Sequence, residues 1–273
     1  MTITLSTVVP LAGLVALGLS AAMAFAWGVQ RATGNSGWID ACWSYATGAA
    51  GVAMAVVPLD DGAAAWRQWL VAGVMAAWGL RLGTHIARRA AAGHEDPRYG
   101  AFRRDWGAGF QARMFRFLQL QAFAGFLLVL SVLAAARHPA AGFRVADAVA
   151  LLVLAVAVVG EAVADAQLRR FRADPKNRGL VCEAGLWGWS RHPNYFFEWL
   201  LWCSFPVMAI GAGWGWMALS LVAPAWMYWL LVHVSGIPPL EAVMVASRGE
   251  RYRDYQARVP AFFPWKKGGF FFF

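Results

Sequence analysis

The chain has 273 residues, of which 60% are hydrophobic and only 14% are charged, and its formal net charge is +9. Soluble globular domains contain about 25% charged residues, so this composition excludes most soluble enzymes, disordered chains and coiled coils. The apolar excess predicts an all-α integral membrane protein. Its scattered cysteines indicate neither a disulfide framework nor a metal site.

About seven apolar segments approach the length of roughly 20 residues that crosses a bilayer. The first has no basic leader or cleavage site, so we expect a retained helix and not a signal peptide. The last two are separated only by Gly211–Gly213, which predicts a tight helical hairpin. The predicted spans are Val8–Val29, Ala41–Leu59, Trp69–Ala87, Phe115–Ala136, Ala146–Ala164, Tyr195–Ile210 and Trp214–Val234.

Basic residues are distributed unevenly among the connecting segments. Most lie in residues 88–116, 169–191 and 248–267, which share one side of a seven-span chain. The loops on the opposite side contain Arg67, Arg137 and Arg144. Because cytoplasmic loops are enriched in Lys and Arg, we expect the N-terminus outside and the C-terminus in the cytoplasm, across the inner membrane if the protein is bacterial. The basic charge is thereby explained by topology, and nothing further in the sequence supports nucleic-acid binding.

The densest polar stretch lies at the end of the fifth predicted span. Glu161, Asp165, Arg169 and Arg172 recur every three or four positions, so they share one face of a helix. One interpretation is a ladder of intrahelical salt bridges that caps the span. The other is an anion site, in which arginines bind phosphate and carboxylates bind ribose hydroxyls or an amide.

A second polar cluster occupies Gly185–Trp199. Pro193 predicts a helix start there, whose free backbone N–H groups would face a ligand. Asn194 and Glu198 would then stack one turn apart on that helix. Alone, the cluster is also consistent with an interfacial anchor in an aromatic belt. Together with the polar stripe it predicts a ligand pocket, whereas the glycine-containing segment Gly93–Gly100 is expected to be a plain loop.

Three motifs of the C-terminal half resemble the steroid 5-alpha-reductase family, and more narrowly its bacterial membrane branch. They are D-x-Q-x-x-x-F-R from Asp165, G-L-W-x-x-S-R-H-P-N-Y-x-x-E from Gly185, and Y-x-x-Y-x-x-x-V-P-x-F-F-P from Tyr252. The resemblance covers about Asp147–Trp265. It implies NADPH-dependent reduction of a carbon–carbon double bond conjugated to a ketone, in a steroid or another lipid that enters from the bilayer.

The resemblance also implies an organisation and a set of cofactor contacts. We expect one transmembrane domain over residues 1–273, with the lipid substrate served by residues 1–140 and NADPH by residues 147–265. The tail, residues 268–273, has no assigned role, and no obligate protein partner is evident. The implied NADPH contacts are Asp165, Arg169, Arg172, Trp187, Arg191, His192, Asn194, Tyr195, Glu198, Glu241, Arg248 and Tyr255.

Reduction of an enone needs a second set of groups. Addition of hydride to the β-carbon moves negative charge onto the carbonyl oxygen, which then requires a proton donor or a strong hydrogen bond. Related eukaryotic enzymes use a Glu and a Tyr on early helices. The nearest positional candidates here are Asp40 and His85, with Tyr45 as a further donor. Asp40 is equally a candidate helix N-cap, and His85 a candidate core histidine.

Two other functions remain open from the sequence. The Arg-His-Pro-x-Tyr block also occurs in isoprenylcysteine carboxyl methyltransferases and phospholipid methyltransferases, so an S-adenosylmethionine-dependent methyltransferase is the alternative enzyme. A lipid-binding scaffold is the non-enzymatic alternative. It leaves the ionisable residues Asp165, His192 and Glu198 unexplained, since such residues within membrane segments are usually functional.

Overall fold

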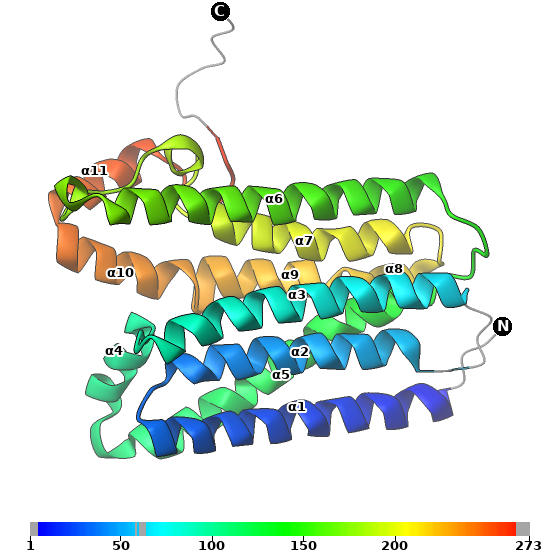
Figure 1. Ribbon diagram of the computed structural model, residues 1–273. Helices are drawn as coiled ribbons and strands as arrows, with labels where there is room; N and C mark the ends of the chain where they lie inside the picture. The colour runs from blue at the N-terminus through cyan, green and yellow to red at the C-terminus, as the bar shows by residue number, and fades with distance from the viewer. Residues whose placement is uncertain (1–4, 58, 60–63, 266–273) are drawn as a thin grey trace, which may run out of the picture. The chain divides into compact units, whose positions relative to one another are not determined.

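The computed structural model describes residues 5–57, 59 and 64–265, which form helices and connecting turns without a strand (Figure 1). The all-α prediction is thereby confirmed, while the tail at residues 268–273 lies outside the described part. The α-helices are α1 (Leu5–Thr33), α2 (Gly37–Val56), α3 (Ala65–Ala91), α4 (Pro97–Trp106), α5 (Phe110–Ala136), α6 (Val145–Ala173), α7 (Pro193–Ala209), α8 (Trp214–Ser220), α9 (Val222–Trp229), α10 (Ile237–Arg248) and α11 (Glu250–Arg258).

Length and composition make several of these segments suitable for crossing a bilayer. Among the described residues, the five segments that qualify are Val8–Thr33, Ala65–Ala91, Arg98–Ala136, Val145–Ala173 and Trp214–Arg248. The predicted spans Ala41–Leu59 and Tyr195–Ile210 correspond to α2 and α7, which are helical but do not belong to these five. A multi-pass membrane protein is therefore supported, while the count of seven spans and the orientation of the termini stay predictions.

The described residues divide into two compact units. The first unit contains the residues up to Ala146 together with Phe205–Trp226, and the second contains Asp147–Ser204 together with the described residues from Met227 onward. The predicted break at Gly211–Gly213 is confirmed, because α7 ends at Ala209 and α8 begins at Trp214. Gly211 and Gly213 both have positive φ (89° and 95°), which a side chain would strain.

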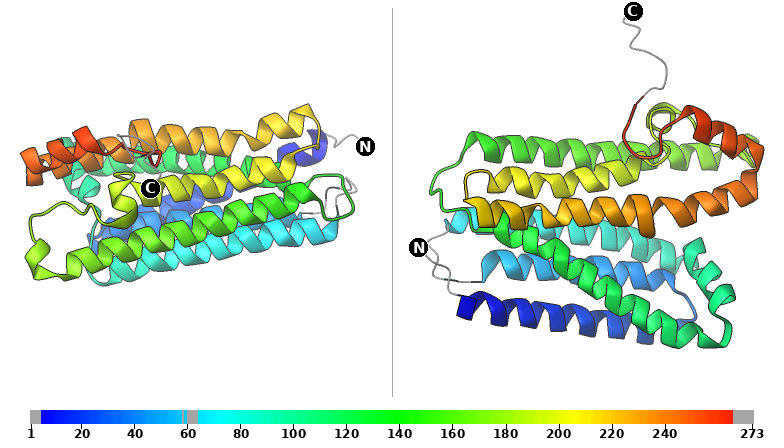
Figure 2. Two further views of the ribbon diagram at one scale, coloured as in Figure 1. Left: turned by 90° about the horizontal axis from the view of Figure 1, so that it is seen from above. Right: turned by 180° about the vertical axis from the view of Figure 1, so that it is seen from behind.

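Glycines allow α2 and α3 of the first unit to pack backbone against backbone. A Cβ added to Gly48 would lie 2.8 Å from the Cα of Gly79, and one added to Gly83 would lie 2.7 Å from the ring of Tyr45. Small residues at such interfaces let apolar helices approach closely where lipid supplies no hydrophobic drive for association. α5 crosses α1 and α2 obliquely and completes this unit's core (Figure 2).

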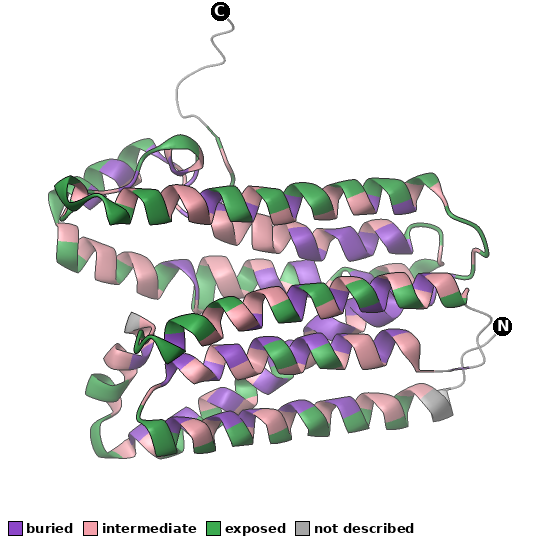
Figure 3. Ribbon diagram, viewed as in Figure 1, coloured by how far each residue is buried: buried purple, intermediate pink, exposed green. Residues whose placement is uncertain are grey.

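The share of buried residues is high in α5 and low in α1 and α6. In the most apolar stretch of α5, 56% of the residues are buried, against 22% in α1 and 22% in α6. Figure 3 shows exposed residues along the length of both α1 and α6. Their exposed side chains include Leu14, Phe25, Leu152 and Val159. These apolar surfaces are suited to contact with lipid acyl chains.

Two arginines on the predicted less basic side close the ends of helices in the first unit. Arg137 donates hydrogen bonds to carbonyls at the C-terminal end of α2, including that of Ala55 at 3.3 Å. Arg144 donates to carbonyls at the C-terminal end of α7, including that of Met208 at 2.5 Å. Because carbonyls at a helix C-terminus lack partners and carry partial negative charge, these cations satisfy them.

Two predictions about the first unit are wrong. Gly93–Gly100 is not wholly a loop, because α4 begins at Pro97 and the side chain of Asp96 caps it by accepting from the N–H of Arg98 at 2.9 Å. Asp40 is not an N-cap, because Ser36 occupies that position and Asp40 lies in the first turn of α2. In the second unit, α10 and α11 were not predicted either, because at 12 and 9 residues both are too short to cross a bilayer.

Candidate functional site

The predicted polar stripe lies on one continuous helix. α6 extends from Val145 to Ala173, so Glu161, Asp165, Arg169 and Arg172 share it as expected. Glu161 is buried, Asp165 is half-buried, and both arginines are exposed. The stripe therefore runs from the apolar part of α6 to its solvent-accessible end.

The segment that precedes α7 is fixed against α6. The N–H of Leu186 donates to Oε1 of Gln167 at 2.9 Å, and Nε1 of Trp187 donates to the carbonyl of Ala164 at 2.9 Å. Gly185 turns the chain with φ of 58°, and a Cβ there would lie 2.3 Å from the side chain of Gln167. The positive φ favours glycine at this turn. Trp187, a predicted cofactor contact, thus has a structural partner on α6.

The start of α7 brings an amide to the carboxylate of the stripe. α7 begins at Pro193 as predicted, and Nδ2 of Asn194 lies 3.4 Å from Oδ1 of Asp165 on α6. One turn later, Oε1 of Glu198 accepts from Nε1 of Trp202 at 3.0 Å. All of these carboxylate and amide groups belong to the second unit. The pairing gathers hydrogen-bond donors and acceptors in a half-buried place.

A single carboxylate joins the same segment to α10 and α11. Glu241 accepts from Nε and Nη2 of Arg191 at 2.6 and 3.1 Å, and from Nε2 of Gln256 at 2.6 Å. Nε2 of His192 lies 3.0 Å from the carboxylate, and the hydroxyl of Tyr252 donates to it at 3.3 Å. This Glu241 cluster holds Arg191 in a bidentate ion pair, the strong geometry for a guanidinium.

His192 is held rigidly within the Glu241 cluster. Its side chain is 3% exposed, and its ring stacks on that of Tyr195 with centroids 5.5 Å apart. Burial lowers the pKa of His192, against the opposing hydrogen bond and charge of Glu241. The imidazole is therefore neutral at pH 7, and its single N–H is available to Glu241. This arrangement fixes the orientation of Tyr195.

Residues of α10, α11 and the chain after them form hydrogen bonds with the segment that precedes α7. The hydroxyl of Tyr255 donates to the buried carbonyl of Trp187 at 2.5 Å, and burial raises the pKa of Tyr255, so it stays protonated. The N–H of Arg191 donates to the carbonyl of Pro260 at 2.9 Å. Nε of Arg248 lies 3.4 Å from the carbonyl of Leu180. These predicted cofactor contacts shape the site through bonds to the chain itself.

The proposed enone-activating residues fall into different networks of the first unit. Asp40 accepts from the hydroxyl of Tyr99 at 2.7 Å and from Arg98 at 3.4 Å, which fixes α4 to the first turn of α2. Tyr45 instead shares a hydrogen bond of 2.9 Å with the hydroxyl of Thr84 on α3. Asp40 and Tyr45 therefore face different helices.

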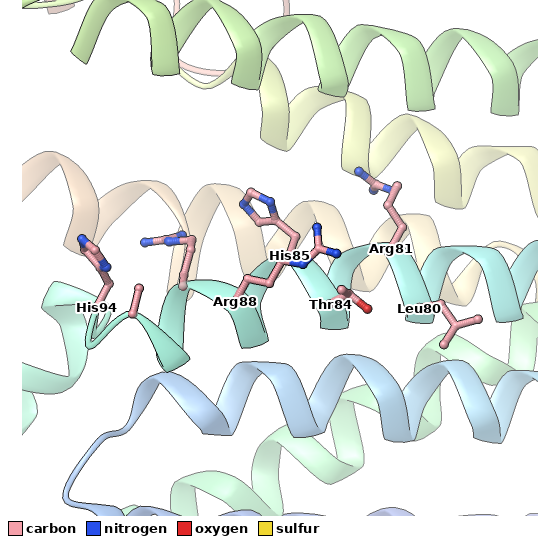
Figure 4. Close-up of a pocket in the computed structure, with 8 residues that line it drawn as sticks. Leu80, Arg81, Thr84, His85, Arg88 and His94 are labelled. Carbon is pink, nitrogen blue, oxygen red and sulfur yellow. The ribbon is translucent and has the colours of Figure 1, made fainter. Parts of the chain in front are cut away.

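His85 lines a cavity on α3 (Figure 4). Its volume is about 720 Å³, and Thr84, the partner of Tyr45, lines it as well. Arg81 and His85 project from the same side of α3 in Figure 4, one helical turn apart. His85 is exposed, so the alternative of a buried core histidine is wrong.

Several residues of these networks were not singled out from the sequence. Gln167 could have been identified because it belongs to the D-x-Q motif that begins at Asp165. Tyr252 could have been identified because it lies three positions before Tyr255, on the same helix face. Gln256 and Tyr99 carried no such signal, because their partners are distant in the chain.

Of the comparisons with known proteins, only the comparison with protein families gives a match. No curated protein and no solved structure matches the chain. One family matches residues 26–259, which include the Asp165–Asn194 pair, the Glu241 cluster and the α3 cavity. The chain belongs to this family, DUF1295, which is described as a protein family of unknown function.

Proposed function

We propose that the protein is an NADPH-dependent reductase of a lipid enone, such as a 3-oxo-Δ4 steroid. The observation that carries the proposal is the meeting of Asp165 and Asn194, 3.4 Å apart, beside the exposed arginines of α6. The resemblance of these motifs to steroid 5-alpha-reductases supplies the reaction. The seven-span topology is part of this proposal, because it places the C-terminus in the cytoplasm, where NADPH is available.

The donor set of the second unit fits the chemical groups of NADPH. Its carboxamide and ribose hydroxyls need both donors and acceptors, which Asp165, Asn194 and Glu198 provide. Its phosphates need cations, which Arg169 and Arg172 provide from the exposed end of α6. In this proposal the Glu241 cluster positions the segment before α7 and does not itself contact phosphate.

The residues of the first unit are assigned to the substrate. When bound, NADPH supplies the hydride that adds to the β-carbon of the enone. A donor that hydrogen-bonds to the carbonyl oxygen stabilises the negative charge developing there. We assign the donation of this hydrogen bond to His85, because His85 lines a cavity. Tyr45 is a second donor, since its hydroxyl is hydrogen-bonded to Thr84, which lines the same cavity. Asp40 is tied to Arg98 and Tyr99, so we assign it the positioning of α4.

The test uses protein purified in detergent, with NADPH and progesterone, and detects the dihydro product by mass spectrometry. Asn194→Ala and Arg172→Ala are each expected to weaken NADPH binding by about 10- to 150-fold, the loss typical of a charge-assisted hydrogen bond of about 1.5–3 kcal/mol. Arg253→Ala is the control, because Arg253 is exposed on α11 in a surface pair. Saturable binding of S-adenosylmethionine without binding of NADPH would refute the reductase and favour the methyltransferase.

A further inference from the structure

The cavity on α3 is large enough for a small lipid. Its volume of about 720 Å³ lies within the range of roughly 300–1,000 Å³ that is typical of ligand pockets. All of its lining residues belong to the first unit and come from the C-terminal half of α3 and the turn that follows. The lining residues are Leu80, Arg81, Thr84, His85, Arg88, Arg89, Ala92 and His94.

The lining of this cavity is cationic. It includes three arginines and two histidines, and none of these eight residues is acidic. The positive charge of Arg89 is partly offset by the negative charge of Asp96, which does not line the cavity. Burial alone would raise the pKa of Asp96, but Arg98 and, more weakly, Arg89 lower it. Arg88 is exposed at the cavity and contributes a positive charge there. A neutral ligand would gain nothing from these charges.

We propose that the α3 cavity binds the enone substrate and selects a lipid that carries a negative charge, a carboxylate or a phosphate, away from its carbonyl group. This inference rests on the proposed reductase function and names its substrate class. The guanidinium of an arginine can donate two parallel hydrogen bonds to a carboxylate or phosphate. An anionic group on the substrate would therefore bind these arginines, whereas a neutral steroid would not.

The order of side chains along α3 suits a ligand with two different ends. Arg88 and Arg89 follow His85 by three and four residues, which is about 5–6 Å along the axis at roughly 1.5 Å per residue. With the carbonyl group at His85, the anionic group meets these arginines. Leu80 and Ala92 border the cavity at either end of this series and offer apolar contact to the hydrocarbon.

The reaction leaves the anionic group unchanged. The carbon–carbon π bond breaks, a new C–H bond forms at the β-carbon with hydrogen from NADPH, and the α-carbon takes a proton that His85 can relay from water. The enone would be reduced to the saturated ketone, with bound NADPH as the two-electron reductant that leaves as NADP⁺. The charge of the substrate therefore acts on binding and orientation alone.

A matched pair of probes tests the proposal: 3-oxo-4-androstene-17β-carboxylic acid and its methyl ester, which differ in charge but share the enone. We expect kcat/KM for the acid to exceed that for the ester by at least about 10-fold. Arg88→Gln is expected to abolish this preference, because it should lower kcat/KM for the acid more than kcat/KM for the ester. Arg113→Gln, which removes an exposed arginine of α5, is expected to keep the preference.

A binding measurement separates this inference from the proposed function. Without NADPH, the acid should bind the detergent-solubilised protein more tightly than the ester, with an affinity that falls as salt is added. Equal binding and equal turnover of the two probes would overturn the inference and leave the reductase intact. An Arg88→Gln variant that raises the KM for NADPH equally with both probes would likewise overturn it, by assigning Arg88 to the cofactor. Reduction of neither probe would contradict the proposed reductase. The comparison of acid and ester binding would still test whether the cavity prefers an anionic lipid.

Discussion

Replacing Glu241 with alanine removes the carboxylate that joins the segment before α7 to α10 and α11. The side chains of Arg191 and Glu241 are only 10% and 12% exposed, so the substitution leaves a largely buried guanidinium without its carboxylate, bonded to the carbonyls of Gln256 and Val259. Breaking a buried ion pair in this way costs about 3–5 kcal/mol. Three further side chains lose a hydrogen-bond partner at the same position. We therefore expect Glu241→Ala to be among the most destabilising single changes in the second unit.

The assay is thermal unfolding of the purified protein in detergent. At roughly 2–4 °C per kcal/mol for a chain of this size, the melting temperature should fall by about 6–20 °C. Glu250→Ala is the matched control, because the side chain of Glu250 is 85% exposed and pairs with Arg253 on the surface of α11. Such surface pairs contribute about 1 kcal/mol or less. Equal melting temperatures for the two variants would refute the assignment of Glu241 as the link.

Three further predictions concern other contacts. Tyr255→Phe leaves the buried carbonyl of Trp187 without its donor, so it should cost about 1–3 kcal/mol in the same assay, and an unchanged melting temperature would contradict this. Gly48→Val forces a side chain against the backbone of Gly79 and should destabilise the first unit by at least about 1–3 kcal/mol, whereas native-like melting would show that α2 and α3 do not pack so closely. Because the folded pKa of His192 lies below the ordinary value of 6.5, the unfolded chain binds more protons just below that pH, and stability should fall as pH drops from 7. The fall should be smaller in His192→Gln; an equal fall would assign the effect to other groups.

The long apolar helices could be predicted because apolar length alone specifies them. Pro193 and the break at Gly211–Gly213 were predicted from local rules for helix starts and turns, and both are confirmed. α4 was missed because its residues are mostly polar, and its start depends on the Asp96 cap and on a buried contact between Tyr99 and Asp40. No periodicity in that segment indicates a partner on α2.

The candidate site could be predicted in its chain positions but not in its pairings. The spacing of Asp165 and Arg172 identified a shared helix face, since that depends only on the helical repeat. The bidentate bond between Arg191 and Glu241 joins residues 50 positions apart, and nothing local indicates it. The cofactor contact of Arg191 stays a prediction, and the structure adds a partner for it within the chain, Glu241.

The most direct test of the central claim is the transfer of isotope from the cofactor to the lipid. The protein in detergent would be incubated with a 3-oxo-Δ4 steroid and NADPH labelled with deuterium at C4 on one face or the other. The proposed reductase predicts that one of the two labelled cofactors places deuterium on the β-carbon of the product, and that Asn194→Ala slows this transfer. A saturated product without deuterium from either cofactor, or no product while S-adenosylmethionine is consumed, would contradict the proposed function.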